Sequence, residues 1–301
     1  MMLQPGTLWK RTQEQTQFAL STGALQSIPT EYQFIEQDGI SFFVRIVSNL
    51  ARKEKAKQQQ QQKSQSSEKP FDPFLPYEED LFVADFSPTH VCLLNKYNVV
   101  DHHLLIVTRH FEEQEDLLTL QDFEALWMGL AEIDGFVFYN AGADAGASQR
   151  HKHLQLIQLP LVPNGVKVPI EPAFNSAQFS RNIGICSQLP FVHGLIKLNP
   201  LIVNSPQVAA TTLDYYHQLL KFVGIQGGNG INGKQSAAYN LMITREWMLL
   251  IPRTQESFEG ILVNSLGCCG AMLVKTEEQL QHLREITPLT VLRQVCVSKS
   301  S

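Results

Sequence analysis

Cysteines are scarce and scattered in this chain of 301 residues. The five thiols form no CxxC pair and lie near no second Cys/His cluster; they are Cys92, Cys186, Cys268, Cys269 and Cys296. An odd, dispersed set is typical of reduced thiols rather than of a disulfide framework. We therefore predict no structural zinc and no metal ligand from the protein. The adjacent Cys268 and Cys269 do not by themselves support a redox function.

Long apolar runs and an excess of basic residues are also absent. No run is long enough to cross a membrane, and residues 1–10 lack the charged and apolar regions of a secretory signal. The net charge of −5 provides no global basic field for nucleic acid. We expect a cytoplasmic protein with no membrane or nucleic-acid partner. Small phosphorylated molecules are still compatible with this composition as ligands, because a few local lysines and amide groups can hold them.

Large apolar side chains are missing from one internal segment. Residues 52–69 carry lysines, serines and five consecutive glutamines, with no apolar side chain larger than Ala56. Such a segment cannot bury enough apolar surface to offset the entropy lost on ordering. We predict a disordered loop over about residues 54–69.

The rest of the chain has the pattern of a folded α+β protein, with 44% hydrophobic residues overall. Asp38-Gly39 is a strong hairpin-turn signal between two apolar runs. Periodicity predicts helices over residues 7–25, 119–133, 213–223 and 276–286. Strands are predicted over 31–36, 40–47, 91–95, 103–108, 136–139, 191–198, 239–244 and 247–251, with a further strand beginning at His151. Residues 104–109 (LLIVTR) faintly resemble 249–254 (LLIPRT), which fits a chain of two related halves.

The most informative motif is GASQRHKHLQ over residues 146–155. Because side chains alternate on a strand, His151, His153 and Gln155 share one face. Two histidines at this spacing could ligate a metal, although Gln155 would be a poor third ligand. A neutral imidazole could instead attack phosphorus, with its other ring nitrogen held by a backbone carbonyl. The small residues before the strand would let backbone N–H groups approach phosphate oxygens.

This motif resembles the active-site signature of the diadenosine tetraphosphate phosphorylases, or ATP adenylyltransferases, of the histidine-triad superfamily. The third histidine of the triad is a glutamine in this branch. Other segments resemble the family in the same order, from about residue 42 to residue 275: FDPF at 71–74, LLNK at 93–96, HLLIVT at 103–108, YN at 239–240, NSLG at 264–267, and Lys275.

The resemblance implies a histidine-triad-like α+β fold with two related sheet-plus-helix halves, similar to the galactose-1-phosphate uridylyltransferase architecture. It implies a catalytic half over residues 1–180 and an ATP adenylyltransferase half over 181–301. The implied reaction cleaves diadenosine tetraphosphate with phosphate to ATP and ADP. Its substrates would be these small molecules, with Mg²⁺ accompanying the nucleotide and no tightly bound cofactor. The protein would be a monomer or a homodimer.

The resemblance also assigns roles to residues of this chain. His153 matches the nucleophile, Gln155 the residue that contacts the phosphoryl group, and His151 the first histidine of the catalytic motif. The matched nucleotide and phosphate contacts are Lys53, Asn95, Lys96, Asn140, Gly146, Ala147, Ser148, Gln149, Asn264, Ser265, Leu266 and Lys275. Arg150 departs from the usual family residue, and Ala271-Met272 stands where the family tends to have Gly-Met.

Three alternatives remain beside this interpretation. A histidine-triad hydrolase is disfavoured by Gln155, because an amide cannot supply a proton at neutral pH. A hexose-phosphate uridylyltransferase would have metal-binding cysteines and a His-Pro-His-Pro-Gln core. A nucleotide-binding sensor without catalysis is disfavoured by the intact His153 and Gln155.

Overall fold

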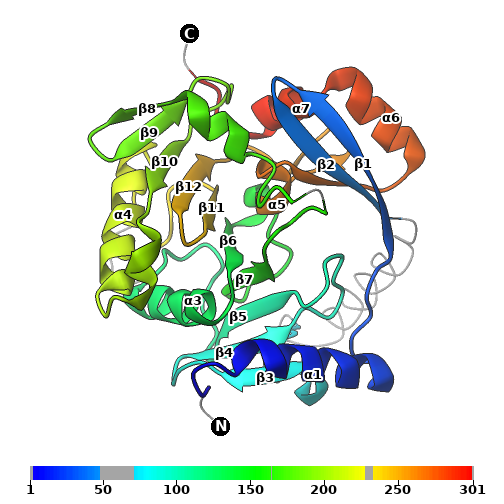
Figure 1. Cartoon of the computed structure of the whole chain (residues 1–301), viewed down its shortest axis with the longest axis vertical. Helices are drawn as coiled ribbons and strands as arrows, with labels where there is room; N and C mark the ends of the chain where they lie inside the picture. The colour runs from blue at the N-terminus through cyan, green and yellow to red at the C-terminus, as the bar shows by residue number, and fades with distance from the viewer. Residues whose placement is uncertain (1–2, 48–70, 164, 228–232, 300–301) are drawn as a thin grey trace.

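Strands from both ends of the chain form one continuous sheet at the centre of the protein. The computed structural model describes residues 3–47, 71–163, 165–227 and 233–299. Lys53 and the tract 54–69, for which a nucleotide contact and disorder are predicted, lie outside these ranges. The ten strands run in the order β3-β4-β5-β7-β6-β11-β12-β10-β9-β8 (Figure 1). They are β3 (Phe82–Asp85), β4 (His90–Leu94), β5 (Leu104–Thr108), β6 (Gly135–Ala141), β7 (His153–Gln158), β8 (Ala177–Ser180), β9 (Ile183–Cys186), β10 (Gly194–Lys197), β11 (Tyr239–Ile243) and β12 (Trp247–Pro252).

The order of these strands contains an internal symmetry. Read outward from the centre, the N-terminal strands run β6, β7, β5, β4 and β3, and the C-terminal strands run β11, β12, β10, β9 and β8. The two halves meet where Asn140 of β6 pairs with Asn240 of β11, and a tyrosine precedes each asparagine. The related halves are therefore present, with helix α3 (Leu120–Glu132) and helix α4 (Val208–Phe222) in equivalent places.

This symmetry corrects the internal repeat proposed from sequence. Residues 104–109 and 249–254 fall on β5 and β12, which occupy different positions in the two halves. The counterpart of β12 is β7, the histidine strand. Short buried strands share apolar residue types whatever their position in a sheet, so the similarity of LLIVTR and LLIPRT did not indicate equivalence.

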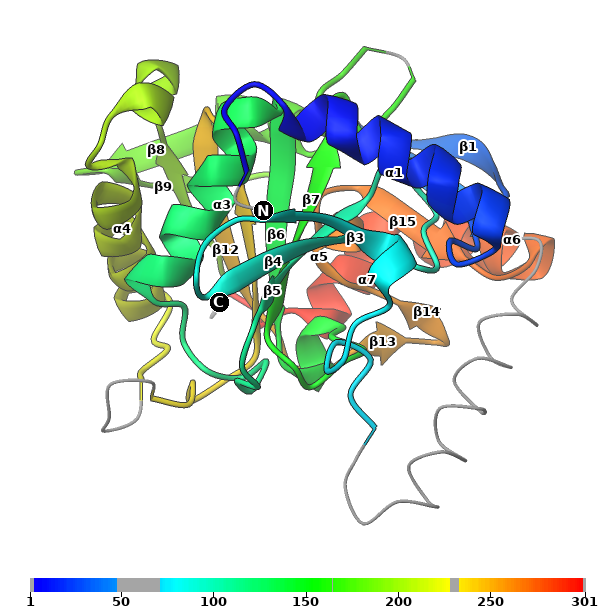
Figure 2. The ribbon, with the colours of Figure 1, turned by 90° about the horizontal axis from the view of Figure 1, so that it is seen from below.

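Helices cover one face of the large sheet. Helices α3 and α4 pack against it, and Leu126 of α3 and Leu219 of α4 belong to one buried apolar cluster that includes Leu154 and Leu156 of β7. Figure 2 shows α3 and α4 on one side of the sheet. Helix α1 (Leu8–Thr22) lies within the predicted range 7–25, contacts β3 and β4, and ends where Gly23 adopts a left-handed φ of 77°. The predicted start of α3 is also confirmed, because Thr119 and Asp122 form a reciprocal capping box.

A smaller sheet lies over the other face. The predicted hairpin is β1 (Thr30–Gln37) and β2 (Ile40–Val47), turning at Asp38-Gly39 with positive φ at both residues. Strand β15 (Ala271–Val274) joins β2 in parallel. Helices α5 (Ser265–Cys268), α6 (Glu277–Ile286) and α7 (Pro288–Val295) complete this layer, together with the short pair β13 (Ser257–Phe258) and β14 (Ile261–Leu262).

Several predicted boundaries differ from the structure. The strand predicted over 191–198 is the shorter β10, because residues 191–193 turn into it and Phe191 forms only an isolated bridge with Ser298. Helix α4 begins at Val208, before the predicted residue 213. Strands β3, β8 and β9 and helix α7 were not predicted. Short 3₁₀ helices occupy Glu79–Leu81, Ala143–Ala145, Glu171–Ser176 and Pro200–Asn204. In the described ranges, no helix has both the length and the apolar character needed to cross a bilayer.

Candidate active site

The two motif histidines lie on one face of the sheet at the start of β7. Strand β7 begins at His153, and His151 makes an isolated bridge with Glu113, so the strand starts two residues later than predicted. The predicted sharing of a face is nevertheless confirmed. The ring of Phe74 lies 5.6 Å from that of His151 and 5.4 Å from that of His153. Gln155, half-buried, follows on the same face between Leu105 of β5 and Phe138 of β6.

His153 is held as a neutral imidazole. Its side chain is buried, and its Nδ1 lies 2.8 Å from the carbonyl oxygen of His151. A carbonyl can only accept, so Nδ1 carries the proton and Nε2 keeps its lone pair. Burial lowers the pKa of His153 to about 4, against the raising effect of this hydrogen bond. At neutral pH the ring is therefore uncharged and can act as a nucleophile through Nε2.

His151 is fixed at both ring nitrogens. Nδ1 lies 2.8 Å from Oδ2 of Asp72, and Nε2 lies 2.7 Å from the carbonyl oxygen of Thr108. Nε2 also lies 3.0 Å from the hydroxyl of Thr108. Because each ring nitrogen already has a protein partner, His151 is not placed to ligate a metal or to attack substrate. Its role is to fix the carbonyl that holds His153. Asp72 is a functional residue that the sequence does not single out beyond its place in the FDPF segment.

A metal site is not formed around these histidines. In the part of the chain that the structure describes, no three His, Cys, Asp or Glu side chains are grouped as metal ligands. The metal-pair interpretation of His151 and His153 is also disfavoured by geometry, because both ring nitrogens of His151 are already hydrogen-bonded to Asp72 and Thr108.

The small-residue loop before β7 packs directly on the C-terminal half. Gly146 has a φ of 87°, and a Cβ there would lie 2.8 Å from Cβ of Asn264 and 3.0 Å from the carbonyl oxygen of Val263. Only glycine fits this position. The structure thus brings Gly146 and Asn264 together, as their predicted roles in one site require. Ala147 and Gln149 are half-buried, and Ser148 is exposed.

Asn140 lies beneath this contact and binds protein groups through its amide oxygen. The Oδ1 accepts from the backbone N–H of Ser265 at 3.0 Å, from its hydroxyl at 2.7 Å, and from the amide of Asn240 at 2.9 Å. Ser265 is fully buried, and Asn264 caps α5 by accepting from the N–H groups of Leu266 and Gly267. Asn140 therefore positions the segment 264–266 from below.

Arg253 is a further anchor that sequence reasoning missed. The guanidinium is buried and donates to Oδ1 of Asn240 at 2.6 Å and to the carbonyl oxygen of Val263 at 2.9 Å. These bonds fix the chain just before Asn264. The sequence signal was weak, because an arginine after an apolar strand is more often exposed.

The remaining predicted contacts lie at the edge of the site. The amide nitrogen of Asn95 is 3.2 Å from Nδ1 of His103, and Lys96 forms an ion pair with Glu78 at 2.5 Å. Lys275 follows β15, and its backbone N–H donates to Gln279. The structure places Asn95 and Lys96 at the end of β4 and Lys275 at the end of β15.

A buried ionic network lies behind the histidine strand. Lys152 points to the opposite face, where its ammonium is 3.0 Å from Asp122 and 2.9 Å from Glu112. Asp122 also lies 3.0 Å from Nε2 of His90. Burial alone would raise the pKa of Asp122, but His90 and Lys152 outweigh it and lower the pKa to about 2. Nothing in the sequence pairs Asp122 with His90 or Lys152, because the three residues lie in separate segments of the chain.

Comparison with protein families matches almost the whole chain. Residues 1–176 match the family model described as the Ap4A phosphorylase N-terminal domain. Residues 187–298 match the model described as the ATP adenylyltransferase C-terminal domain. The division of the chain near residue 180 into two functional halves stays a prediction.

Two curated yeast proteins are similar in sequence. Diadenosine 5',5'''-P1,P4-tetraphosphate phosphorylase 2 of Saccharomyces cerevisiae is 29% identical over 279 residues, covering 83% of this chain and 81% of the yeast protein. Protein APA1 of the same organism is 28% identical over 233 residues, covering 70% of each.

A solved structure shows the same fold. The crystal structure of yeast Ap4A phosphorylase Apa2 superposes with a TM-score of 0.80 at 23% identity, covering 100% of this chain and 97% of the yeast chain. The structure described as its complex with Ap4A gives a TM-score of 0.79. The predicted α+β fold is confirmed, and it is the fold of the yeast protein.

Proposed function

Because the chain belongs to the Ap4A phosphorylase family, we propose that it is a nucleotidyltransferase that cleaves diadenosine tetraphosphate with inorganic phosphate to ATP and ADP. The observation that carries the proposal is the state of His153, whose buried, neutral ring presents Nε2 while the His151 carbonyl holds Nδ1. A yeast relative named as a diadenosine tetraphosphate phosphorylase supports it.

The first step is attack of His153 on the α-phosphorus of diadenosine tetraphosphate. The Nε2–P bond forms as the bond to the bridging oxygen breaks, and ATP leaves with that electron pair. The N–H at Nδ1 stays on the His151 carbonyl, so the positive charge that develops on the ring is next to an acceptor. ATP is a stable anion, and its departure does not require a strong general acid.

The second step is attack of inorganic phosphate on the adenylyl-histidine. A phosphate oxygen forms the new P–O bond, the N–P bond breaks, and ADP leaves while His153 recovers its lone pair. Gln155 lies on the same face of β7 and supplies an amide N–H to a phosphoryl oxygen. Because this amide activates water poorly, transfer to phosphate is favoured over hydrolysis.

We propose that the nucleotide is held by groups from both halves of the chain. The loop 146–149 and the segment 264–266 lie against each other where Gly146 contacts Asn264. The N–H groups of Gly146 and Ala147 hold the turn of this loop by donating to the carbonyl oxygens of Ala143 and Gly142. Lysines at positions 53, 96 and 275 complete the set of cationic groups for the polyphosphate. Mg²⁺ would enter on the polyphosphate itself, with phosphate oxygens and water as ligands, because the described residues provide no ligand cluster.

The test is a product analysis. The protein is incubated with diadenosine tetraphosphate, with and without phosphate, and the nucleotides are resolved by chromatography. ATP and ADP that form only with phosphate are the expected result. AMP and ATP without phosphate would instead identify a histidine-triad hydrolase, and tight binding without turnover a sensor.

His153→Ala is the decisive variant. It removes the nucleophile, so we expect no detectable turnover while the variant still binds AMP. Radiolabelled substrate should label the wild type covalently in the absence of phosphate and should leave His153→Ala unlabelled. Full activity of this variant would refute the assignment of the nucleophile.

A further inference from the structure

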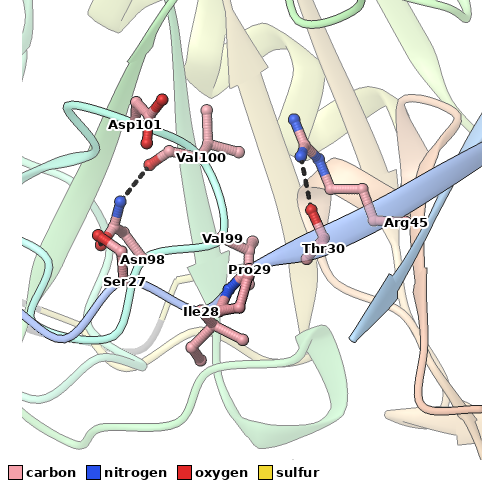
Figure 3. A pocket seen from close by; sticks show the side chains of 9 residues that line it. All are labelled: Ser27, Ile28, Pro29, Thr30, Arg45, Asn98, Val99, Val100 and Asp101. Carbon is pink, nitrogen blue, oxygen red and sulfur yellow. Dashed lines mark hydrogen bonds between the residues drawn. The ribbon is translucent and has the colours of Figure 1, made fainter. Parts of the chain in front are cut away.

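A cavity of about 340 Å³ opens between the small sheet and the turn that joins β4 to β5 (Figure 3). Its walls come from residues 27–30 before and at the start of β1, Arg45 of β2, and residues 98–101. Its volume lies within the roughly 300–1,000 Å³ that is usual for small-molecule sites. None of its lining residues is among the predicted catalytic or nucleotide contacts.

Arg45 is the cationic group of this cavity. Its Nη1 donates to the hydroxyl of Thr30 at 2.9 Å, and the guanidinium carbon lies 4.8 Å from the ring centre of Phe43. Burial lowers the pKa of Arg45, while the field of Asp101 opposes this effect. No carboxylate of the described residues approaches Arg45 within 4.0 Å to form an ion pair. A partly desolvated guanidinium that lacks such a partner is suited to bind an anion.

The cavity adjoins both edges of the predicted nucleotide site. The linker after α1 is fixed to the turn by bonds from the N–H of Gln26 to the carbonyl of Lys96 and from that of Ile28 to Asn98. On the other side, Arg45 pairs with Leu273, which lies two residues before Lys275. The elements that carry Lys96 and Lys275 therefore continue directly into the cavity walls.

The rest of the lining suits a nucleoside. Ile28, Pro29, Val99 and Val100 provide apolar surface of the kind that contacts a base. The carboxylate of Asp101 lies across the cavity from Arg45 in Figure 3. A carboxylate accepts from ribose hydroxyls and repels phosphate, whereas the guanidinium attracts phosphate. The two charges thus set one orientation for a bound nucleotide.

We propose that this cavity binds the leaving nucleotide, the ATP half of the dinucleotide, with Arg45 on its phosphates and Asp101 on its ribose. This inference rests on the proposed function. It assigns the two ends of the substrate to different places: the transferred AMP binds at His153, and the departing ATP binds between β2 and the turn 98–101.

The first experiment measures ATP binding by calorimetry with excess AMP present to fill the transfer site. Arg45→Gln should weaken ATP binding by about 10- to 100-fold, as expected for loss of a charged hydrogen bond. Arg45→Lys, which keeps the charge but not the planar fork, should have an intermediate effect. Arg284→Gln is the matched control, because Arg284 is an exposed arginine that donates to Gln33 on β1. Unchanged ATP binding in Arg45→Gln would overturn the inference whether or not the wild type is active.

The second experiment compares two reactions of the wild type and the variant. Phosphorolysis of diadenosine tetraphosphate uses both ends of the substrate, whereas exchange of labelled phosphate into ADP uses only the transfer site. Arg45→Gln should lower kcat/KM of phosphorolysis much more than that of exchange. Equal losses in both reactions would show that Arg45 only supports the fold. A wild type that binds ATP in an Arg45-dependent way but performs neither reaction would refute the proposed function and leave the cavity assignment standing.

Discussion

The side-chain amide of Asn240 donates to Oδ1 of Asn140 at 2.9 Å, at the point where the two halves of the sheet meet. The two asparagines occupy equivalent positions in the two halves, but their amide oxygens accept hydrogen bonds from different groups. Oδ1 of Asn140 accepts from the hydroxyl of Ser265, whereas Oδ1 of Asn240 accepts from the guanidinium of Arg253. The backbone N–H of Arg253 donates to the carbonyl oxygen of Ala238, the residue just before β11. Gln155 pairs with the residue two positions before Asn140, and Ala238 lies two positions before Asn240, so Arg253 takes the place in its half that Gln155 takes in the other. In one half this strand carries the residues of the proposed chemistry, and in the other it ends at the arginine that holds the segment 264–266.

Replacement of Asn240 by alanine should destabilise this junction. The change removes donors to Asn140 and to the carbonyl of Ala145 and leaves the buried Arg253 with one acceptor fewer. Unsatisfied buried polar groups cost about 1–3 kcal/mol each, so we expect a loss of about 2–4 kcal/mol in the free energy of unfolding. Urea denaturation measures it. Asn182→Ala, which removes an exposed bond to Gln218, is the control and should change little. Equal effects of both variants would contradict the role of the junction.

Local signals in the sequence predicted the elements and the reactive strand. Asp38-Gly39 predicted the hairpin, Thr119 predicted the start of α3, and the alternation of His151, Lys152 and His153 predicted the faces of the strand. Each of these depends on neighbours within a few residues. Periodicity and turn preference act over that range, and for this reason they can be read from one sequence.

The partners of these residues could not be predicted in the same way. Asp72 meets His151, and Asp122 meets Lys152, only after strands and loops from distant segments are assembled. The parallel pairing of β2 with β15 likewise joins residues 43 and 271. Nothing in the local pattern distinguishes a carboxylate with such a partner from one exposed to solvent. The internal repeat failed for the same reason, since equivalence depended on the order of strands in the sheet.

The ion pair behind the histidine strand gives a double-mutant test. Lys152→Met leaves the buried carboxylate of Asp122 without its ammonium partner, although His90 and the Thr119 cap still contact it. Breaking a buried pair on one side costs about 3–5 kcal/mol. Lys152→Met combined with Asp122→Asn removes both charges, so it should recover part of that loss. Denaturation of the two single variants and the double variant gives the coupling energy, and additive losses would contradict a direct interaction.

Stability should fall in acid because of His193. Its Nε2 accepts from the N–H of Cys186 at 2.8 Å and its Nδ1 lies 2.9 Å from the carbonyl of Phe191, so the folded ring is neutral. Burial lowers the pKa of His193 from 6.5 to about 4. The unfolded chain therefore binds a proton that the folded chain does not. The contribution of the neutral His193 to the free energy of unfolding is fully present above pH 6.5. It is lost as the pH falls towards 4, by up to about 3 kcal/mol.

His193→Gln tests this pH dependence. The amide cannot titrate but can still accept from Cys186, so the variant should lose less stability than the wild type between pH 7 and pH 4.5. Urea denaturation at both pH values measures the difference. His282→Gln changes an exposed histidine that pairs with Glu259 and serves as the control. Burial lowers the pKa of His153 as well, so the free energy of unfolding should still fall somewhat with decreasing pH in both variants. If His193→Gln lost as much stability as the wild type between pH 7 and pH 4.5, the role of His193 would be refuted.

Asp72 should control the rate of the reaction through His151. Asp72→Ala frees Nδ1 of His151 and lets the ring move, and with it the carbonyl that orients His153. Misplacement of a reacting group by about 1 Å can cost roughly 100-fold, so we expect kcat to fall between about tenfold and 100-fold. KM should change much less, because Asp72 contacts His151 and is not among the groups proposed to hold the nucleotide. Asp72→Asn keeps an acceptor for Nδ1 and should restore part of the rate. Glu113→Gln is the matched control, because it also removes one negative charge, here from an exposed ion pair with Arg150, and it should leave kcat nearly unchanged. If Asp72→Ala lowered only the free energy of unfolding while kcat of the folded enzyme stayed unchanged, Asp72 would be a structural residue and not a positioning one.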